Sequence, residues 1–232
     1  MSHKTYFNWS SGKDSALALH YLLQDRNFSV EKLVTTINTH HNRVSMHGLR
    51  KELLLKQTHA LGLPLQLITL PETPSMAIYE QKMTEAINVL KTEGFTHSAF
   101  GDIFLEDLKN YRESQLKKYQ LQSVFPLWKK DTKTLLNKFI DLGFKSVIVC
   151  ASSKYFDKDF VGTVIDKRFI NNLPKTVDPC GENGEFHTFC FDGPIFKTPV
   201  SFTIGEKVYR EYDSPSHHEN GKYGVWYGDL LP

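Results

Sequence analysis

The sequence predicts an α/β fold, a doubly wound parallel sheet of five strands, followed by a smaller α+β domain. Two observations lead to this prediction. Short apolar runs alternate with helix-like patterns through the first half of the chain, and this regular alternation ends near residue 128. Such alternation is typical of a parallel sheet with helices on both faces. A mixed α+β domain is the alternative.

In the first half, each strand is predicted from a short run of mainly apolar residues. The predicted strands are residues 5–9, 32–38, 65–70, 97–103 and 123–127. The helices between them show apolar residues near helical spacing, and glycine ends two of them, at Gly62 and Gly94. The predicted helices are residues 14–23, 47–61, 75–92 and 106–119.

The second half is less regular, and we divide the chain into residues 1–128 and residues 129–232. One more helix–strand unit and a further helix precede a segment rich in proline and glycine. These elements are residues 134–143, 146–151 and 160–171. A hairpin of residues 200–204 and 207–212 is then predicted around Gly205 and Glu206. The tail, residues 213–232, receives no assignment.

Composition excludes several classes of protein. The 232 residues carry 28 basic and 26 acidic side chains, a net charge of +2, which gives no support for a surface that coats nucleic acid. Three cysteines outside CxxC pairs favour neither a disulfide framework nor a zinc ribbon. Without an apolar segment long enough for a membrane, a cytoplasmic enzyme or binding protein is expected. The oligomeric state, with a homodimer among the options, stays open.

The segment FNWSSGKDS, residues 7–15, has the features of a phosphate-binding loop between a strand and a helix. Small residues let backbone N–H groups approach an anion, and the helix N-terminus adds a favourable dipole. The spacing is neither that of a Walker A loop nor that of a dinucleotide-binding loop. A serine-rich turn with a good helix cap is the alternative. The residues selected here are Ser10, Ser11, Gly12, Lys13, Asp14 and Ser15.

Two further segments carry acidic groups where ligands are expected. In residues 100–128, which begin FGDIFLED, Asp102 comes directly after Gly101, at the carboxyl end of the fourth predicted strand. In DPCGENGEFHTFCFDGPIF, residues 178–196, three carboxylates, a thiol and an imidazole fall within the first ten positions of a glycine-bent loop. Such a combination points to binding or catalysis, and a polar loop with a hydrogen-bonded histidine is the alternative. The candidate residues of this loop are Glu182, Glu185 and His187.

The first loop resembles the SGGxDS loop of the PP-loop ATPases, with Ser11 where the commonest pattern has glycine. All three motifs together resemble the diphthine–ammonia ligase family, also described as ATP-binding domain 4. The resemblance covers residues 6 to about 212 and is nearest to the family's short prokaryotic branch. It implies a PP-loop (HUP-type) domain that binds ATP, and a reaction that amidates the carboxylate of diphthine on elongation factor 2 with ammonia. In a bacterium, which lacks diphthamide, the acceptor would have to be another carboxylate.

The resemblance also implies roles for the selected residues. The loop Ser10–Ser15 would hold the pyrophosphate of ATP, with Mg²⁺ near Asp14 or Asp102, and Gly101 would lie at the nucleotide. The adenine would lie beyond the second strand, near Thr36, Ile37 and Asn38. Glu182, Glu185 and His187 would hold the acceptor or ammonium and move a proton, and Asp102, which can reach ligand or metal, is a further catalytic candidate. His187 is expected to titrate near neutral pH.

Two rival functions remain open at this stage. A PP-loop sulfurtransferase that modifies RNA would use Cys180 to carry sulfur, although the chain has no CxxC pair. A nucleotide-binding sensor would use the same pocket without chemistry. The histidines His40, His41 and His47 suggest a metal only weakly, because no acidic partner stands at ligand spacing, and a surface loop is the preferred interpretation.

Overall fold

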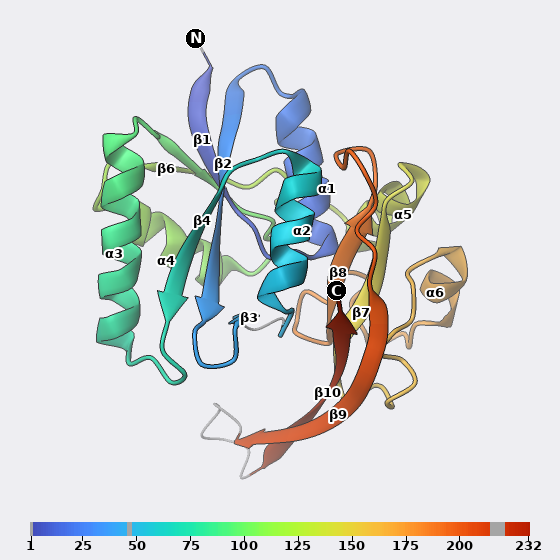
Figure 1. The fold of residues 1–232 in the computed structure, drawn as a ribbon. Coiled ribbons are helices and arrows are strands. Elements are labelled where there is room, and N and C mark those ends of the chain that lie inside the picture. The colour runs from blue at the N-terminus through green and yellow to red at the C-terminus, as the bar shows by residue number, and fades with distance from the viewer. Residues whose placement is uncertain (1, 46–47, 214–220) are drawn as a thin grey trace.

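The computed structural model describes residues 2–45, 48–213 and 221–232, whose strands form two sheets (Figure 1). The first sheet contains five parallel strands in the order β4-β2-β1-β5-β6. Their bounds are β1 (His3–Asn8), β2 (Phe28–Asn38), β4 (Leu65–Leu70), β5 (His97–Ala99) and β6 (Gln122–Val124). The predicted five-stranded parallel sheet is confirmed. A short strand, β3 (Arg43–Val44), adds one antiparallel pairing at the end of β2.

Helices cover both faces of this sheet (Figure 1). One face carries α1 (Lys13–Gln24) and α2 (Lys51–Leu61), and the other carries α3 (Met76–Thr92) and α4 (Glu106–Lys117). Successive residues of a strand point to opposite faces. In β1, accordingly, Phe7 packs in the cluster with α1 and α2, whereas Tyr6 packs in the cluster with α3 and α4. This is the doubly wound arrangement.

The second sheet is antiparallel, in the order β8-β7-β10-β9. Its strands are β7 (Lys145–Ser152), β8 (Phe186–Asp192), β9 (Thr203–Asp213) and β10 (Lys222–Leu231). Helix α5 (Thr132–Asp141) precedes β7, and helix α6 (Lys167–Asn172) lies between β7 and β8. The long strands β9 and β10 curve away from the body as a ribbon below the first sheet (Figure 1).

Several predicted elements of the second half are wrong. The hairpin around Gly205 does not form, because β9 runs unbroken through that position and pairs with β10. Strand β8 was not predicted at all, although it carries His187. The helix expected at 160–171 is reduced to α6, whose start at Lys167 is capped by the side chain of Asp166. The first part of the predicted range includes Gly162, whose φ of 91° is not helical.

Helix α2 begins at Lys51, and the start predicted at His47 lies outside the described residues. The strands predicted to extend to residues 103 and 127 end earlier, at Ala99 and Val124, so Asp102 belongs to a loop. Within the ranges that the structure describes, no helix combines the length and apolar character needed to cross a bilayer.

One apolar core joins the two sheets. Leu17 of α1 and Leu53 of α2 share a buried cluster with Val147 of β7 and Phe189 of β8. Helices α1 and α2 therefore lie between the parallel sheet and the antiparallel sheet (Figure 1). This packing brings the start of α1, and the loop before it, against β8. The proposed division at residue 128 falls across this shared core.

Candidate active site

The turn between β1 and α1 has an uncommon backbone conformation. Ser11 has a φ of 71°, in the left-handed region that favours glycine, and its side chain is fully buried. This conformation accounts for the glycine in the commonest PP-loop pattern. The hydroxyl groups of Ser10 and Ser15 are 2.7 Å apart, and the amide of Ser10 donates to the Ser15 hydroxyl at 3.2 Å. These bonds close the turn before α1 begins.

The side chain of Gln57, fully buried in α2, fixes the same turn to its surroundings. Its amide nitrogen donates to the carbonyl oxygens of Ser11, at 3.0 Å, and Cys190, at 2.6 Å. Its oxygen accepts from the indole N–H of Trp9 at 2.7 Å. Gln57 falls within the helix predicted at residues 47–61, where it has no predicted role of its own. A glutamine inside an apolar stripe is itself a signal, because a buried amide needs hydrogen-bond partners.

Lys13, the first residue of α1, contacts the loop before β8 and β8 itself. Its amide donates to the side-chain oxygen of Thr188 at 3.0 Å. Its ammonium group donates to Asp14 at 2.7 Å and also to the carbonyl oxygen of Cys180. Burial is the largest single influence and lowers the pKa of Lys13, but the neighbouring groups, Asp14 foremost through its charge and its hydrogen bond, together raise it. The ammonium is therefore charged. These contacts place the loop of residues 178–185 (the acidic loop) directly against the turn of residues 10–15 (the phosphate-type turn).

Gly101 and Asp102 lie beside the N-terminus of α1. A Cβ atom at Gly101 would lie 3.0 Å from the amide nitrogen of Ser15 and 3.1 Å from the carbonyl carbon of Asp14, so a side chain there would require the start of α1 to shift by a few tenths of an ångström. Asp102 is mostly buried and pairs with Arg112 of α4, with an Nε–Oδ2 distance of 3.1 Å. Burial raises the pKa of Asp102 despite that guanidinium.

Glu182 has the most unusual carboxylate environment of the acidic loop. Its Oε1 accepts from the amide of Ile103 at 2.7 Å, which ties the loop to the segment that holds Asp102. Burial raises its pKa to about 7, and the charges of Asp14 and Asp102 add to the increase. A carboxyl group with this pKa can exchange a proton near neutral pH.

Glu185 and His187 differ from what the sequence suggested. Both oxygens of buried Glu185 accept hydrogen bonds inside its own loop, from the amides of Asp178 and Asn183 and from the Asn183 side chain. Glu185 thus holds the shape of the loop. Burial, together with the positive charge of Lys13, lowers the pKa of His187 to about 4. The expected titration near neutral pH is wrong, and the imidazole is neutral there.

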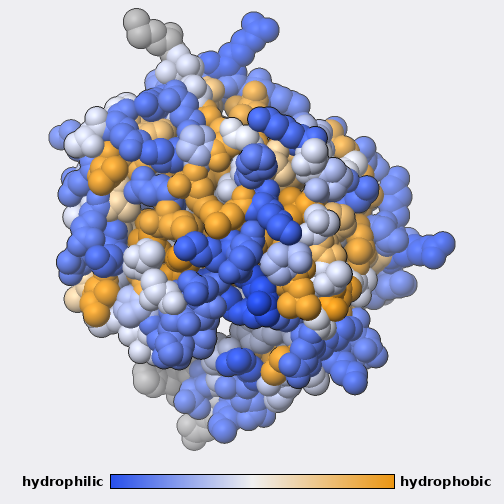
Figure 2. Space-filling view, in the orientation of Figure 1, coloured by the Kyte–Doolittle hydropathy of each residue, from blue (hydrophilic) through white to orange (hydrophobic). Residues whose placement is uncertain are grey.

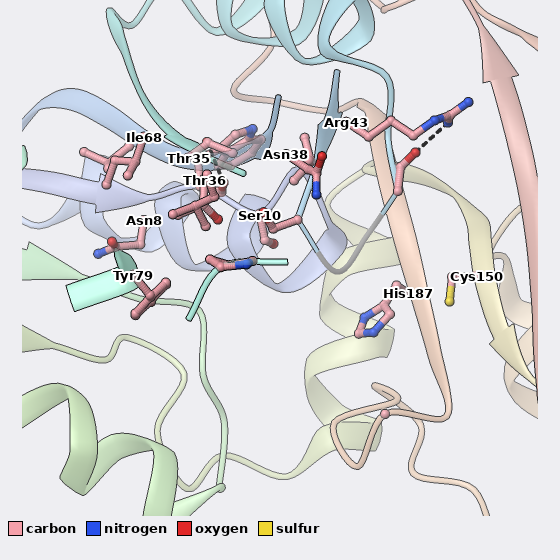
Figure 3. A pocket seen from close by; sticks show the side chains of 18 of the residues that line it. Asn8, Ser10, Thr35, Thr36, Asn38, Arg43, Ile68, Tyr79, Cys150 and His187 are labelled. Carbon is pink, nitrogen blue, oxygen red and sulfur yellow. Dashed lines mark hydrogen bonds between the residues drawn. The ribbon is translucent and has the colours of Figure 1, made fainter. Parts of the chain in front are cut away.

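A cavity of about 1560 Å³ opens between the carboxyl ends of the parallel strands and the antiparallel sheet. Its wall includes Ser10, Thr36 and Asn38 on one side and His187 on the other (Figure 3). Hydrophilic residues surround the hollow in the centre of the face shown in Figure 2. Ile37, which alternates with Thr36 and Asn38 along β2, points into the apolar core instead and is 1% exposed. The prediction that Ile37 lies at the nucleotide is wrong for its side chain.

The cysteines offer no reactive thiolate. Cys180 is buried, its Sγ lies 3.3 Å from the carbonyl oxygen of Thr132, and burial raises its pKa well above the usual range. Burial likewise raises the pKa of Cys150, to about 12, and that of Cys190. A thiol that stays protonated is a poor nucleophile, so these contacts disfavour the sulfurtransferase alternative.

A parallel sheet with a cavity beyond its strand ends, and a tight small-residue loop before α1, is the arrangement in which doubly wound α/β proteins bind nucleotides. Family models agree with this class and narrow it. Residues 3–123 match the model of the diphthamide synthase N-terminal domain, and residues 131–222 match that of the C-terminal domain. The chain belongs to the diphthamide synthase family.

Relatives of known name match parts of the chain. A diphthine–ammonia ligase of Schizosaccharomyces pombe is 30% identical over 100 residues, 41% of this chain and 16% of that protein. The human diphthine–ammonia ligase is 26% identical over 140 residues, 58% of this chain and 52% of that protein. The chain thus spans about half the length, or less, of these relatives. A solved structure of a U34-tRNA thiolase from Methanococcus maripaludis covers 61% of this chain and 57% of that one at 20% identity, with a TM-score of 0.36, and bears no functional weight.

Proposed function

We propose that this protein is an ATP-dependent carboxylate–ammonia ligase. A carboxylate oxygen of the acceptor attacks the α-phosphorus of ATP, and pyrophosphate leaves. Ammonia then attacks the acyl carbon of the adenylate, AMP leaves, and the amide forms with release of a proton. Family membership and the relatives named diphthine–ammonia ligase support this proposal. The acceptor is diphthine or another carboxylate.

The observation that carries the proposal is the contact between Lys13 and the acidic loop. Two motifs that are far apart in the sequence meet there, as a reaction that brings ATP together with an acceptor and ammonia requires. The cavity reaches from Ser10 to His187, so a nucleotide on one side and an acceptor on the other would meet inside it. Reactants held together in this way lose less entropy at the transition state.

ATP would bind with its adenine near Thr36 and Asn38, which line the cavity at the end of β2. Its phosphates would lie at the start of α1, where Ser10 and Ser15 supply hydroxyl groups and the helix dipole favours an anion. The amide of Lys13 donates to Thr188. We therefore assign phosphate binding to the turn as a whole, not to every amide from Ser11 to Ser15.

Magnesium fits the chemistry of the nearby donors. The contact of Gly101 with the backbone of Asp14 and Ser15 places the segment that holds Asp102 beside Asp14, and the charges of both carboxylates raise the pKa of Glu182. Hard oxygen donors of this kind suit Mg²⁺. Asp14 and Asp102 would hold the ion once it displaces Lys13 and Arg112, their present partners. When bound, it would neutralise charge on the phosphates.

On the acceptor side, we assign different tasks to the three predicted residues. Glu182, with its pKa of about 7, would bind ammonium and take up the proton that ammonia releases. Neutral His187 lines the cavity and would orient the acceptor carboxylate through a hydrogen bond. Glu185 would act as a positioning residue, because both its oxygens hold the loop.

The test is pyrophosphate release from ATP and Mg²⁺ with ammonium and a panel of carboxylates, diphthine-containing peptides among them. We expect release that depends on both ammonium and one carboxylate, and loss of release in Glu182→Gln and Asp102→Asn. ATP binding without pyrophosphate release under all conditions would favour the sensor alternative. Full activity of Cys180→Ser would exclude sulfur transfer, and its complete loss would support it.

A further inference from the structure

Two adjacent histidines and a glutamate come together at the edge of the cavity, apart from the residues assigned above. His40 and His41 follow β2, and Glu72 follows β4, the neighbouring parallel strand. One ligand atom from each residue lies within 4.8 Å of the other two. The sequence interpretation set the histidines aside because an acidic partner was missing. The pairing of β2 with β4 supplies that partner.

The separations resemble those of a metal's ligand shell. His41 Nε2 lies 3.3 Å from one oxygen of Glu72, and His40 Nε2 lies 3.8 Å from the other. Zinc binds histidine nitrogen and carboxylate oxygen at about 2.0–2.2 Å, which places neighbouring ligands of a tetrahedron about 3.3 Å apart. Small side-chain rotations would therefore bring all three groups onto one ion. Each side chain is about half exposed, so water can complete the shell.

Asn38 organises both sides of the cluster. Its Oδ1 accepts from the amides of His40, at 3.0 Å, and His41, at 3.2 Å. Its Nδ2 donates to the carbonyl oxygen of Glu72 at 3.1 Å. One side chain thus fixes the backbone of the loop after β2 and that of the loop after β4. Fixed backbone reduces the entropy that binding an ion costs.

We propose that His40, His41 and Glu72 form a binding site for a divalent transition metal of the Zn²⁺ class, which links the loops after β2 and β4. Two imidazoles and one carboxylate form a donor set that binds such ions in preference to Mg²⁺ or Ca²⁺. His41 and Glu72 line the cavity. A bound ion would therefore brace the cavity mouth beside Asn38. The site is independent of the ligase proposal.

The experiment titrates metal-free, untagged protein with Co²⁺, followed by its visible absorption, and with Zn²⁺ by calorimetry. We expect one ion per chain, with affinity reduced roughly tenfold or more in Glu72→Gln and in His41→Ala, since even outer-shell changes cost 10- to 100-fold. The matched control is the double variant His217→Ala/His218→Ala, which removes the other adjacent histidine pair of the sequence and should bind as the wild type does. No nucleotide or acceptor is present, so the result does not depend on catalysis.

Hydrogen exchange provides a second measurement. Zn²⁺ should slow exchange of the amides of residues 39–42 and of Glu72, Thr73 and Ser75 in the wild type and leave both segments unchanged in Glu72→Gln. Equal Zn²⁺ affinity in the wild type and in Glu72→Gln would overturn the proposal. So would loss of binding in the His217→Ala/His218→Ala control, because the ion would then belong to the tail. The three ligands are exposed, so their variants should fold normally.

Discussion

The main-chain amide of Lys13 donates to the side-chain oxygen of Thr188 at 3.0 Å, across a separation of 175 positions in the chain. This bond joins the first turn of α1 to the middle of β8. It fixes the phosphate-type turn of the parallel sheet relative to the strand that carries His187. The geometry of the proposed active site therefore depends on a residue, Thr188, that has no chemistry of its own to contribute.

Replacing Thr188 with valine should weaken the fold and the binding of ATP together. The change leaves the buried amide of Lys13 without its acceptor, a loss of about 1–3 kcal/mol. Urea denaturation measures the free energy of unfolding, and calorimetry measures ATP affinity. Thr92→Val, at an exposed position, should change the free energy of unfolding by no more than about 0.5 kcal/mol. Equal effects of the two substitutions would refute this account of Thr188.

Gln57→Leu should be one of the more damaging single substitutions in the protein. It removes three hydrogen bonds and leaves the indole N–H of Trp9 and the carbonyls of Ser11 and Cys190 buried without that partner. We expect the free energy of unfolding to fall by about 3 kcal/mol or more, measured by chemical denaturation. Gln81→Leu, on an exposed face of α3, is the control and should have little effect. A loss below about 1 kcal/mol for Gln57→Leu would contradict its proposed role.

Glu182 should make the stability of the protein depend on pH. Burial raises its pKa from 4.5 to about 7 in the folded state. Between these values the folded protein holds a proton that the unfolded chain has released, so stability falls as pH rises. The contribution is complete below pH 4.5 and lost above about 7. Thermal unfolding across this range should show a smaller decline in Glu182→Gln, and an identical decline in both proteins would rule out this effect.

Gly101→Ala should disturb the start of α1 without removing any polar group. The added methyl group would lie 3.0 Å from the amide nitrogen of Ser15, and because backbone cannot move aside easily, the turn must shift. We expect a loss of about 1–3 kcal/mol in stability and a weaker affinity for ATP. Gly221→Ala, where an added Cβ meets no atom of the described residues within 4 Å, should leave stability and ATP affinity unchanged. Normal ATP affinity in Gly101→Ala would show that this approach is not required.

The first sheet could be predicted because its strands are buried, apolar and separated by amphipathic helices. Strand β8 could not, since the acidic and glycine residues just before it give residues 178–196 the composition of a loop. Its own residues, Phe186–Asp192, carry the aromatic and β-branched side chains of a strand. In β9, Gly205 resembles a turn residue, but it lies at an irregularity of the ladder, where the register with β10 shifts between Gly228 and Leu230 and pairing resumes at Ile204. Long-range pairing thus overrides a local turn signal.

The motifs correctly brought together the loop of Ser10–Ser15 and the loop of Glu182, whereas the supporting contacts were not foreseen. Gln57 and Thr188 act through hydrogen bonds to main chain, which leave no spacing pattern in a sequence. The error at Ile37 was avoidable, because strand alternation assigns it to the face opposite Thr36 and Asn38. The low pKa of His187 arises from burial and from Lys13, and neither could be read from its loop-like neighbourhood.

The buried cluster that passes from the parallel sheet through α1 and α2 to β7 and β8 limits how this architecture can be altered. A fragment ending at residue 128 would present the apolar side of α1, with Leu17, to water and would aggregate. Exchanging the later half for that of a distant relative would fail unless the helix surface changed with it. The two halves of the chain should therefore be truncated, exchanged or redesigned only together.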